Sequence, residues 1–359
     1  MATDRLVTRA EVTAFVKRCM ISVGTPEEHA ASLADILVTA DYRGHFSHGL
    51  NRLEMYVNEV SSGLSDPKAK PTVIKESPST AYVDGHNGIG SVVGTFCMEI
   101  AMKKAKETGI AWVTCTGSNH YGIAGYYALM AVKQGLIGMS FTNTSPLVVP
   151  TRSKDIAFGT NPIAFGAPAK DDDYYMLDMA TSTVALGKVE MKRRKEEPLP
   201  PGWAVDSDGK ETLDPNDVYK DGGLLPLGGL ELNSGYKGYG LAMMVETICG
   251  VLSGGPFASN IRKWKSDPRV ANLGQTFMAL DPNCFAPGFE DKMQEFMDEI
   301  RGMDPSDPSL PVKVAGDLSR SRMKLADDNG AITYHKNMIS SLNELAERLK
   351  VDPIKVLDS

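Results

Sequence analysis

Hydrophobic residues recur at helical spacing over the N-terminal part of the chain. Thr8 begins the first expected helix as part of a capping box, and Pro26 begins the second, which ends near Gly44. The apolar stripe of a third expected helix covers residues 47–60, and a proline-rich link follows at 65–79. This pattern predicts a helical N-terminal region.

Beyond this link, short apolar strands alternate with helices. A hairpin is expected within 202–214, with its turn at Asp208-Gly209. Further strands are expected at 81–83, 110–115, 136–142, 163–166, 175–179 and 275–280. Further helices are expected at 91–106, 122–134, 183–194, 236–252, 291–301 and 337–350, with a linker at 304–311. Such alternation predicts an α/β protein.

The bulk composition argues against several classes of protein. A length of 359 residues is too great for one small core and predicts two domains. The net charge is −7, so no nucleic-acid partner is expected. No apolar run approaches the roughly 18 residues that span a bilayer, so no membrane partner is expected. The polar N-terminus shows no secretory signal.

The five cysteines are odd in number, and each lies in an apolar part of the sequence. They are far apart, no pair has the spacing of zinc ligands, and no metal is expected. Buried free thiols in a reducing compartment explain this pattern best, which makes the cytoplasm the expected location.

One glycine pattern resembles a dinucleotide-binding fingerprint. Gly88-Ile-Gly90-Ser-Val-Val-Gly94 follows an expected strand and opens an expected helix, with one residue too many before the last glycine. A Rossmann site also needs a carboxylate near the end of the next strand, where it binds a ribose. The stretch 110–120 contains no carboxylate, so helix packing explains these glycines better.

Two segments carry residues suited to proton transfer. His48 and Arg52 are four residues apart, so one helix would present both on the same face. Histidine exchanges protons near neutral pH, and arginine binds a carboxylate through two hydrogen bonds. His120 lies in the small-residue stretch 116–125, between a strand and a helix. Each pattern also fits a structural role, as a solvated pair or a capped helix start.

Other polar segments have weaker patterns. The turns 143–146, 159–162 and 178–182 each lie beside an apolar strand and could hold a pyrophosphate or a ribose. As isolated turns, they are more typical of plain structure. The glycine-spaced 235–240 precedes an apolar helix that contains Glu246, which requires a polar partner.

Together these segments resemble the malate/L-lactate dehydrogenase-like oxidoreductases. Each motif is only moderately specific for this family, but their joint order from about residue 8 to 320 is highly specific. The motifs are Ser47-His-Gly-Leu-Asn-Arg52, Ser118-Asn-His-Tyr-Gly122, Pro150-Thr151-Arg152, Gly159-Thr-Asn-Pro162, Asp178-Met-Ala-Thr181, Gly187-Lys188, Pro201-Gly-Trp-Ala-Val-Asp206 with Asp214-Pro215, and Gly235-Tyr-Lys-Gly-Tyr-Gly-Leu241.

The resemblance implies an α/β fold with a mixed, largely antiparallel central sheet and a non-Rossmann nicotinamide site. Residues 1–78 plus 312–359 would form a helical domain that covers the substrate, and 79–311 a central cofactor-binding domain. A homodimer is expected, with NAD as the cofactor and NADP as the alternative. His48 and His120 match proton-transfer positions, and Arg52 matches a clamp for the substrate carboxylate. Positions that match cofactor contacts are Ser47, Asn143, Asp178, Met179, Ala180, Gly228, Gly229, Ala315, Gly316 and Asp317.

The chain departs from the family pattern at Ala315, where many relatives have proline, and at Ser153, where glycine is usual. No lysine lies near Asn143-Thr144, which argues against ureidoglycolate as the substrate. Reversible hydride transfer between NAD(P) and a small 2-hydroxy or 2-keto acid is the leading hypothesis. Malate/oxaloacetate or lactate/pyruvate is the preferred pair. Reduction of a cyclic imine acid, and a catalytically silent binding protein, are the alternatives.

Overall fold

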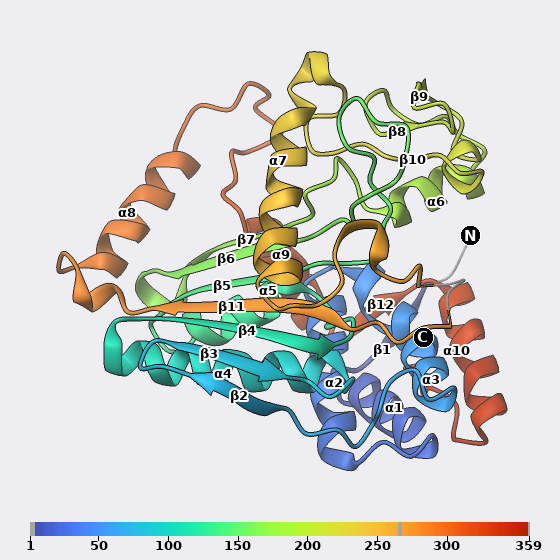
Figure 1. Ribbon diagram of the computed structural model, residues 1–359, viewed down its shortest axis with the longest axis horizontal. Coiled ribbons are helices and arrows are strands. Elements are labelled where there is room, and N and C mark those ends of the chain that lie inside the picture. Colours follow the sequence, from blue (N-terminus) through green and yellow to red (C-terminus); the bar gives the residue numbers. More distant parts are fainter. Residues whose placement is uncertain (1–3, 265–267, 358–359) are drawn as a thin grey trace.

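The computed structural model describes residues 4–264 and 268–357, built around one seven-stranded sheet (Figure 1). Within this sheet β3 and β4 are parallel, and the other neighbouring pairs are antiparallel. In order across the sheet, the strands are β2 (Thr72–Glu76), β3 (Thr80–Asp84), β4 (Ile110–Ser118), β11 (Leu273–Leu280), β5 (Ile137–Thr142), β6 (Ile163–Pro168) and β7 (Tyr174–Met179). The expected mixed, largely antiparallel α/β fold is confirmed.

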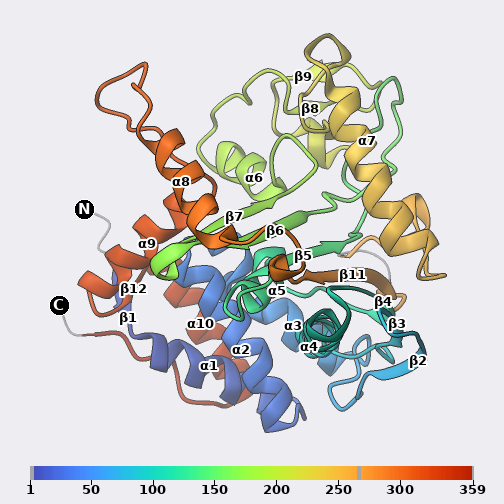
Figure 2. The same cartoon turned by 90° about the vertical axis from the view of Figure 1, so that its left-hand side faces the viewer.

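Helices cover both faces of this sheet. On one face lie α4 (Gly90–Thr108) and α5 (Ala124–Val132), and across the other lies α7 (Gly235–Glu246), which continues into a π-helical turn (Thr247–Val251) (Figure 1, Figure 2). Gly94 of α4 packs against the ring of Tyr127 on α5, and a Cβ atom at this glycine would overlap the ring. Close helix packing therefore accounts for Gly94, and a Cβ atom at Gly90 would overlap the backbone of Asn119 and His120.

The N- and C-terminal segments fold together at one end of the molecule (Figure 1). They share a hydrophobic core to which Phe15, Leu37, Leu53 and Leu342 contribute. Thr8 accepts a hydrogen bond from the Glu11 N–H at 3.2 Å, which confirms the N-cap half of the expected capping box, whereas the Glu11 carboxylate accepts from Arg18 and the Lys355 N–H. The elements at this end are α1 (Arg9–Ser22), α2 (Glu27–Tyr42), α3 (Leu53–Ser61), α9 (Asp317–Asp328), α10 (Lys336–Leu349) and the paired β1 (Arg5–Val7) and β12 (Ile332–Tyr334).

A smaller lobe contains the expected hairpin, in which the Gly209 N–H donates to the Asp206 carbonyl at 3.0 Å. Its strands are β8 (Ala204–Val205), β9 (Glu211–Thr212) and β10 (Gly223–Leu224), and α6 (Leu186–Arg194) lies beside them. On another side, α8 (Phe289–Arg301) and the loop that follows it extend away from the body of the molecule (Figure 2).

The expectation of one continuous helix over 47–60 is wrong. Two 3₁₀ turns, η1 (Phe46–His48) and η2 (Leu50–Arg52), precede α3, and Gly49 between them has a non-helical φ of −96° and ψ of −137°. The buried carboxylate of Asp41 causes the break. It occupies the space that a Cβ atom of Gly49 would need and accepts a hydrogen bond from the Leu50 N–H at 2.9 Å.

Several further features differ from the sequence-based expectations. The link 65–79 contains the edge strand β2, and neither α9 nor the β1/β12 pair was expected. Cys284 is exposed, unlike the four buried cysteines, because it lies in a turn after β11 outside the core. Among the described residues, no helix is both long and apolar enough to cross a bilayer.

Candidate active site

Two histidine rings from distant parts of the chain stack on each other. His48 ends η1, and His120 lies in the loop between β4 and α5. Their ring centroids are 5.7 Å apart, with 21° between the ring planes. The helical end of the molecule and the central sheet therefore contribute one imidazole each to a shared site.

A hydroxyl group holds one nitrogen of each ring. The Ser47 hydroxyl lies 2.8 Å from Nδ1 of His48, and the Tyr56 hydroxyl lies 2.5 Å from Nδ1 of His120. The indole of Trp264 covers His120, with centroids 4.6 Å apart. These contacts fix both rings, and neither Nε2 atom has a hydrogen-bond partner within the described part of the chain.

Both imidazoles are neutral at physiological pH. Burial, and after it the positive charge of Arg52, lowers the pKa of His48 to about 4. Burial, followed by the charges of His48 and Arg52, lowers the pKa of His120 well below its usual range. In the tautomer whose Nδ1–H donates to the neighbouring hydroxyl group, a neutral imidazole can accept a proton at Nε2, so this pair is suited to removing the proton of a bound hydroxyl group.

Arg52 offers part of its guanidinium to a ligand. Nε donates to the Ser47 carbonyl oxygen at 2.7 Å, and Nη1 lies 3.5 Å from Sδ of Met55. Nη2 has no acceptor, and no carboxylate forms an ion pair with this side chain, within residues 4–264 and 268–357. Burial lowers the pKa of Arg52. A half-buried cation beside two neutral imidazoles is suited to binding a carboxylate.

A buried ion pair supports the loop that carries His120. Glu59 pairs with Arg262, and Nδ2 of Asn119 donates to the same carboxylate at 2.6 Å. Nε2 of Gln275 donates to the Asn119 carbonyl at 2.8 Å. The backbone directly before the catalytic candidate is therefore held by α3 and by β11.

The end of β7 carries a second cluster of expected site residues, 178–180. Oδ2 of Asp178 accepts a hydrogen bond from the Gly125 N–H, at the start of α5, at 2.9 Å. The turn 315–317 lies beside the same strand, because the Met176 N–H donates to the Ala315 carbonyl at 3.1 Å. The structure thus brings together two segments that are far apart in the sequence.

Gly228 and Gly229 join this second cluster from the smaller lobe. The Leu227 N–H donates to the Thr181 carbonyl at 2.8 Å, which places the two glycines beside the chain that leaves β7. Ser47 approaches the same region, because a Cβ atom at Gly187, near the start of α6, would lie 3.9 Å from its Cβ. His45 interacts electrostatically with both His48 and Asp178, so the two clusters are neighbours.

Asn143 differs from the other expected cofactor positions, because its side chain is fully buried among protein groups. Its Oδ1 accepts from the Gly274 N–H at 3.1 Å, and its Nδ2 lies 3.5 Å from Glu246. Asn161 donates to the same glutamate at 2.9 Å. These two asparagines are the polar partners that Glu246 requires.

Sequence reasoning missed three side chains at the site. Tyr56 follows Arg52 by four residues, and this spacing could have indicated that both side chains lie on the same helix face. Trp264 reaches His120 only through the tertiary fold. His45 lies beside both clusters: its Nε2 is 3.4 Å from the Ser319 hydroxyl, and the charge of Asp178 opposes the burial that lowers its pKa. In the described ranges, no group of three or more His, Cys, Asp or Glu residues is placed to hold a metal ion.

Comparison with known proteins identifies the family. The malate/L-lactate dehydrogenase family model matches residues 7–343. A malate dehydrogenase from Pyrococcus abyssi is 42% identical over 357 residues, which is 98% of this chain and 96% of the relative. An L-sulfolactate dehydrogenase from Methanocaldococcus jannaschii is 37% identical over 330 residues, 91% of this chain and 92% of the relative.

Solved structures agree as well. The malate dehydrogenase of Pyrococcus horikoshii OT3 superimposes with a TM-score of 0.90 at 39% identity, covering 98% of this chain and 97% of that chain. A dehydrogenase of this kind requires a nicotinamide cofactor, and its substrate is a small hydroxy or keto acid. The chain belongs to the malate/L-lactate dehydrogenase family and is an oxidoreductase.

Proposed function

We propose that the protein catalyses reversible hydride transfer between NAD and malate/oxaloacetate, with lactate/pyruvate as the second substrate pair. The observation that carries this proposal is the stacked pair of neutral histidines beside the partly free guanidinium of Arg52. Malate is preferred because the relative that is 42% identical over nearly the whole chain is a malate dehydrogenase.

The residues beside the histidines fit a nicotinamide dinucleotide. Among the described residues outside its own helix, a Cβ atom at Gly187 would come within 4 Å of Ser47 Cβ alone, so the start of α6 leaves open space beside Ser47. The N-cap residue of α6, Ala185, makes no side-chain cap, which leaves helix N–H groups available to a pyrophosphate. Segments 178–180, 228–229 and 315–317 would hold the rest of the cofactor. When bound, the cofactor accepts or supplies the hydride.

The chain itself would bind, orient and deprotonate the substrate. Arg52 would hold the substrate carboxylate through its free N–H groups, which places the 2-hydroxyl beside the histidines. During oxidation, Nε2 of His48 or His120 would take the hydroxyl proton while the hydrogen on the 2-carbon leaves as hydride. Tyr56 would keep the ring of His120 in the orientation that this transfer requires.

The test is steady-state oxidation of NADH and NADPH with oxaloacetate, pyruvate, another 2-keto acid and a cyclic imine acid. Turnover that is fastest with oxaloacetate and NADH is expected. Turnover with the imine alone would support the alternative reaction, and no turnover with any acid would refute the proposal. The His48→Gln and His120→Gln variants, compared at saturating substrate, would identify the histidine that transfers the proton.

We also infer a homodimer that buries the outer face of α7. Five apolar side chains on this helix and the turn after it are at least 41% exposed: Tyr236, Met243, Met244, Val251 and Leu252. A monomer rarely exposes so continuous an apolar stripe. Light scattering should give twice the chain mass, and Met243→Glu should shift it toward the monomer.

A cytoplasmic location stays a prediction from the free thiols.

A further inference from the structure

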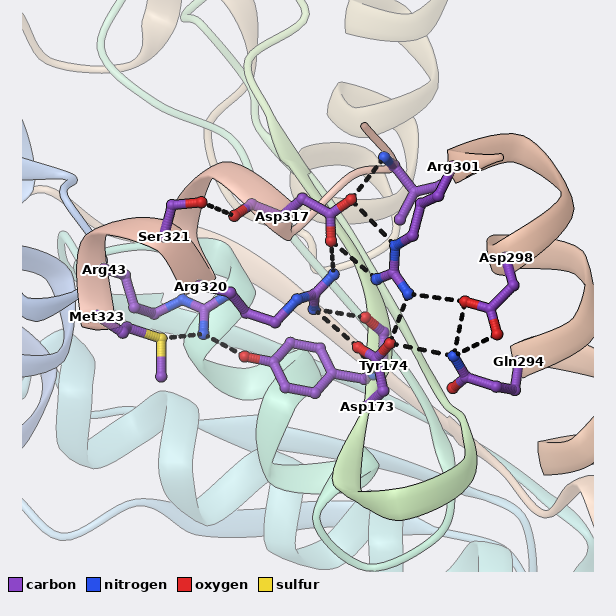
Figure 3. Close-up of polar contacts among 11 residues, drawn as sticks. Arg43, Asp173, Tyr174, Gln294, Asp298, Arg301, Asp317, Arg320, Ser321 and Met323 are labelled. Atoms are coloured by element: carbon purple, nitrogen blue, oxygen red, sulfur yellow. Dashed lines mark hydrogen bonds and ion pairs between the residues drawn. The ribbon is translucent and has the colours of Figure 1, made fainter. Parts of the chain in front are cut away.

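Four charged side chains form a cluster where α8, α9 and the start of β7 meet (Figure 3). Arg301, at the end of α8, donates from Nη2 to Asp317 at 2.8 Å and from Nη1 to Asp173 at 2.7 Å. Arg320 donates to Asp317 at 2.5 Å and to the Tyr174 carbonyl at 2.7 Å. All four side chains are between 16% and 25% exposed, so solvent screens these pairs less than surface pairs.

The carboxylate of Asp317 has no remaining capacity for a ligand. Oδ1 accepts the two guanidinium contacts described above, from Arg301 and Arg320. Oδ2 accepts Nε of Arg301 at 3.2 Å and the Val314 N–H at 2.9 Å. A carboxylate offers about four acceptor sites, and here four donors occupy them. A direct contact between this carboxylate and a cofactor would require the cluster to open.

The same cluster fixes the backbone of the turn before α9. The Ala315 carbonyl accepts from the Met176 N–H of β7 at 3.1 Å. The guanidinium of Arg320 packs over Gly316, where a Cβ atom would lie 3.1 Å from Nη1. At the other end of β7 lie the expected cofactor residues 178–180. The cluster thus sets the position of one cofactor segment relative to another.

We propose that Asp317 is a positioning residue for the cofactor: through Arg301 and Arg320 it holds the turn 315–316 against β7. The turn then presents a fixed backbone to the dinucleotide, and the carboxylate itself does not touch it. This inference rests on the proposed cofactor site. Disruption of the cluster should therefore weaken nucleotide binding while the chemical step, which depends on His48 and His120, is unchanged at saturation.

Asp317→Asn tests the proposal, and Asp298→Asn is the matched control. Asp298 also accepts a hydrogen bond from Arg301, at 3.3 Å, but it is 59% exposed and makes no contact with the turn. Calorimetric titration with NADH and with ADP-ribose measures binding independently of turnover. We expect Asp317→Asn to raise both dissociation constants roughly three- to tenfold, as loss of charge-assisted contacts would. Asp298→Asn should leave both within a factor of two of the unchanged protein.

Further variants separate positioning from a general loss of stability. Arg301→Gln removes the Arg301–Asp317 contacts from the other side, so the double variant with Asp317→Asn should lose less affinity than the two single losses combined. Asp317→Glu keeps the charge and should recover part of the affinity. A lower Tm with unchanged dissociation constants would overturn the inference. If the unchanged protein binds neither nucleotide, the proposed cofactor site itself fails, which is a different result.

Discussion

Replacement of Arg52 is the sharpest test of the active site, because the positive charge of this side chain acts on both histidines. Arg52→Ala removes the guanidinium and its bond to the Ser47 carbonyl. Arg52→Lys keeps the charge but lacks the planar fork that binds a carboxylate through two parallel hydrogen bonds. The two variants therefore separate charge from geometry.

The structure sets the expected size of the effect. Nε is engaged with Ser47, so only Nη1 and Nη2 can reach a substrate carboxylate. Each charge-assisted hydrogen bond contributes roughly 1.5 kcal/mol at the low end of the usual range. Two such bonds give about 3 kcal/mol, or roughly a 150-fold loss of kcat/KM in Arg52→Ala. Arg52→Lys keeps one donor and should lose roughly tenfold.

The assay is steady-state reduction of oxaloacetate by NADH over a wide range of acid concentrations. Most of the loss should appear in KM for the acid, with little change in nucleotide binding, because the clamp acts on the ground state and the transition state alike. Arg348→Ala is the matched control, since Arg348 pairs with Glu54 of α3 on the surface. A loss smaller than about fivefold in Arg52→Ala would refute the assignment of the clamp.

Three further predictions follow from the same geometry. Tyr56→Phe should lower kcat more than it raises KM for the acid, because His120 loses the bond that orients it, and initial rates at saturation check this. Oxidation of the 2-hydroxy acid requires a neutral imidazole, so kcat/KM should be flat above about pH 6 and fall with acid as His48 protonates near its pKa of about 4. A histidine inflection near 6.5 would contradict this. Burial raises the pKa of Asp41 to about 7 from an ordinary value of 3.8, so the folded form is stabilised by protonation. The contribution of this protonation to the free energy of unfolding is complete below pH 3.8 and is lost as the pH rises through about 7. The free energy of unfolding, measured with urea at pH 5 and at pH 8, should therefore differ less between the two pH values in Asp41→Asn than in the unchanged protein.

Local patterns in the sequence predicted most of the regular elements. The N-cap at Thr8 and the alternation of strands and helices after residue 79 depend on neighbours close in sequence, and both agree with the structure. Residues 47–60 show where such patterns fail. The apolar stripe was present, but a buried carboxylate from α2 competed for the backbone N–H of Leu50 and broke the helix at Gly49.

The sequence by itself determined the class of fold, the family and the identity of the chemical groups: two histidines, one arginine and several glycine-rich turns. Only the tertiary structure decided how they meet. The stacking of His48 on His120, and the placement of Trp264 over the second ring, depend on packing between segments far apart in the chain. The depressed histidine pKa values arise in the same way, because burial and a neighbouring cation are properties of the assembled site. No residue carries that information in its own sequence neighbourhood.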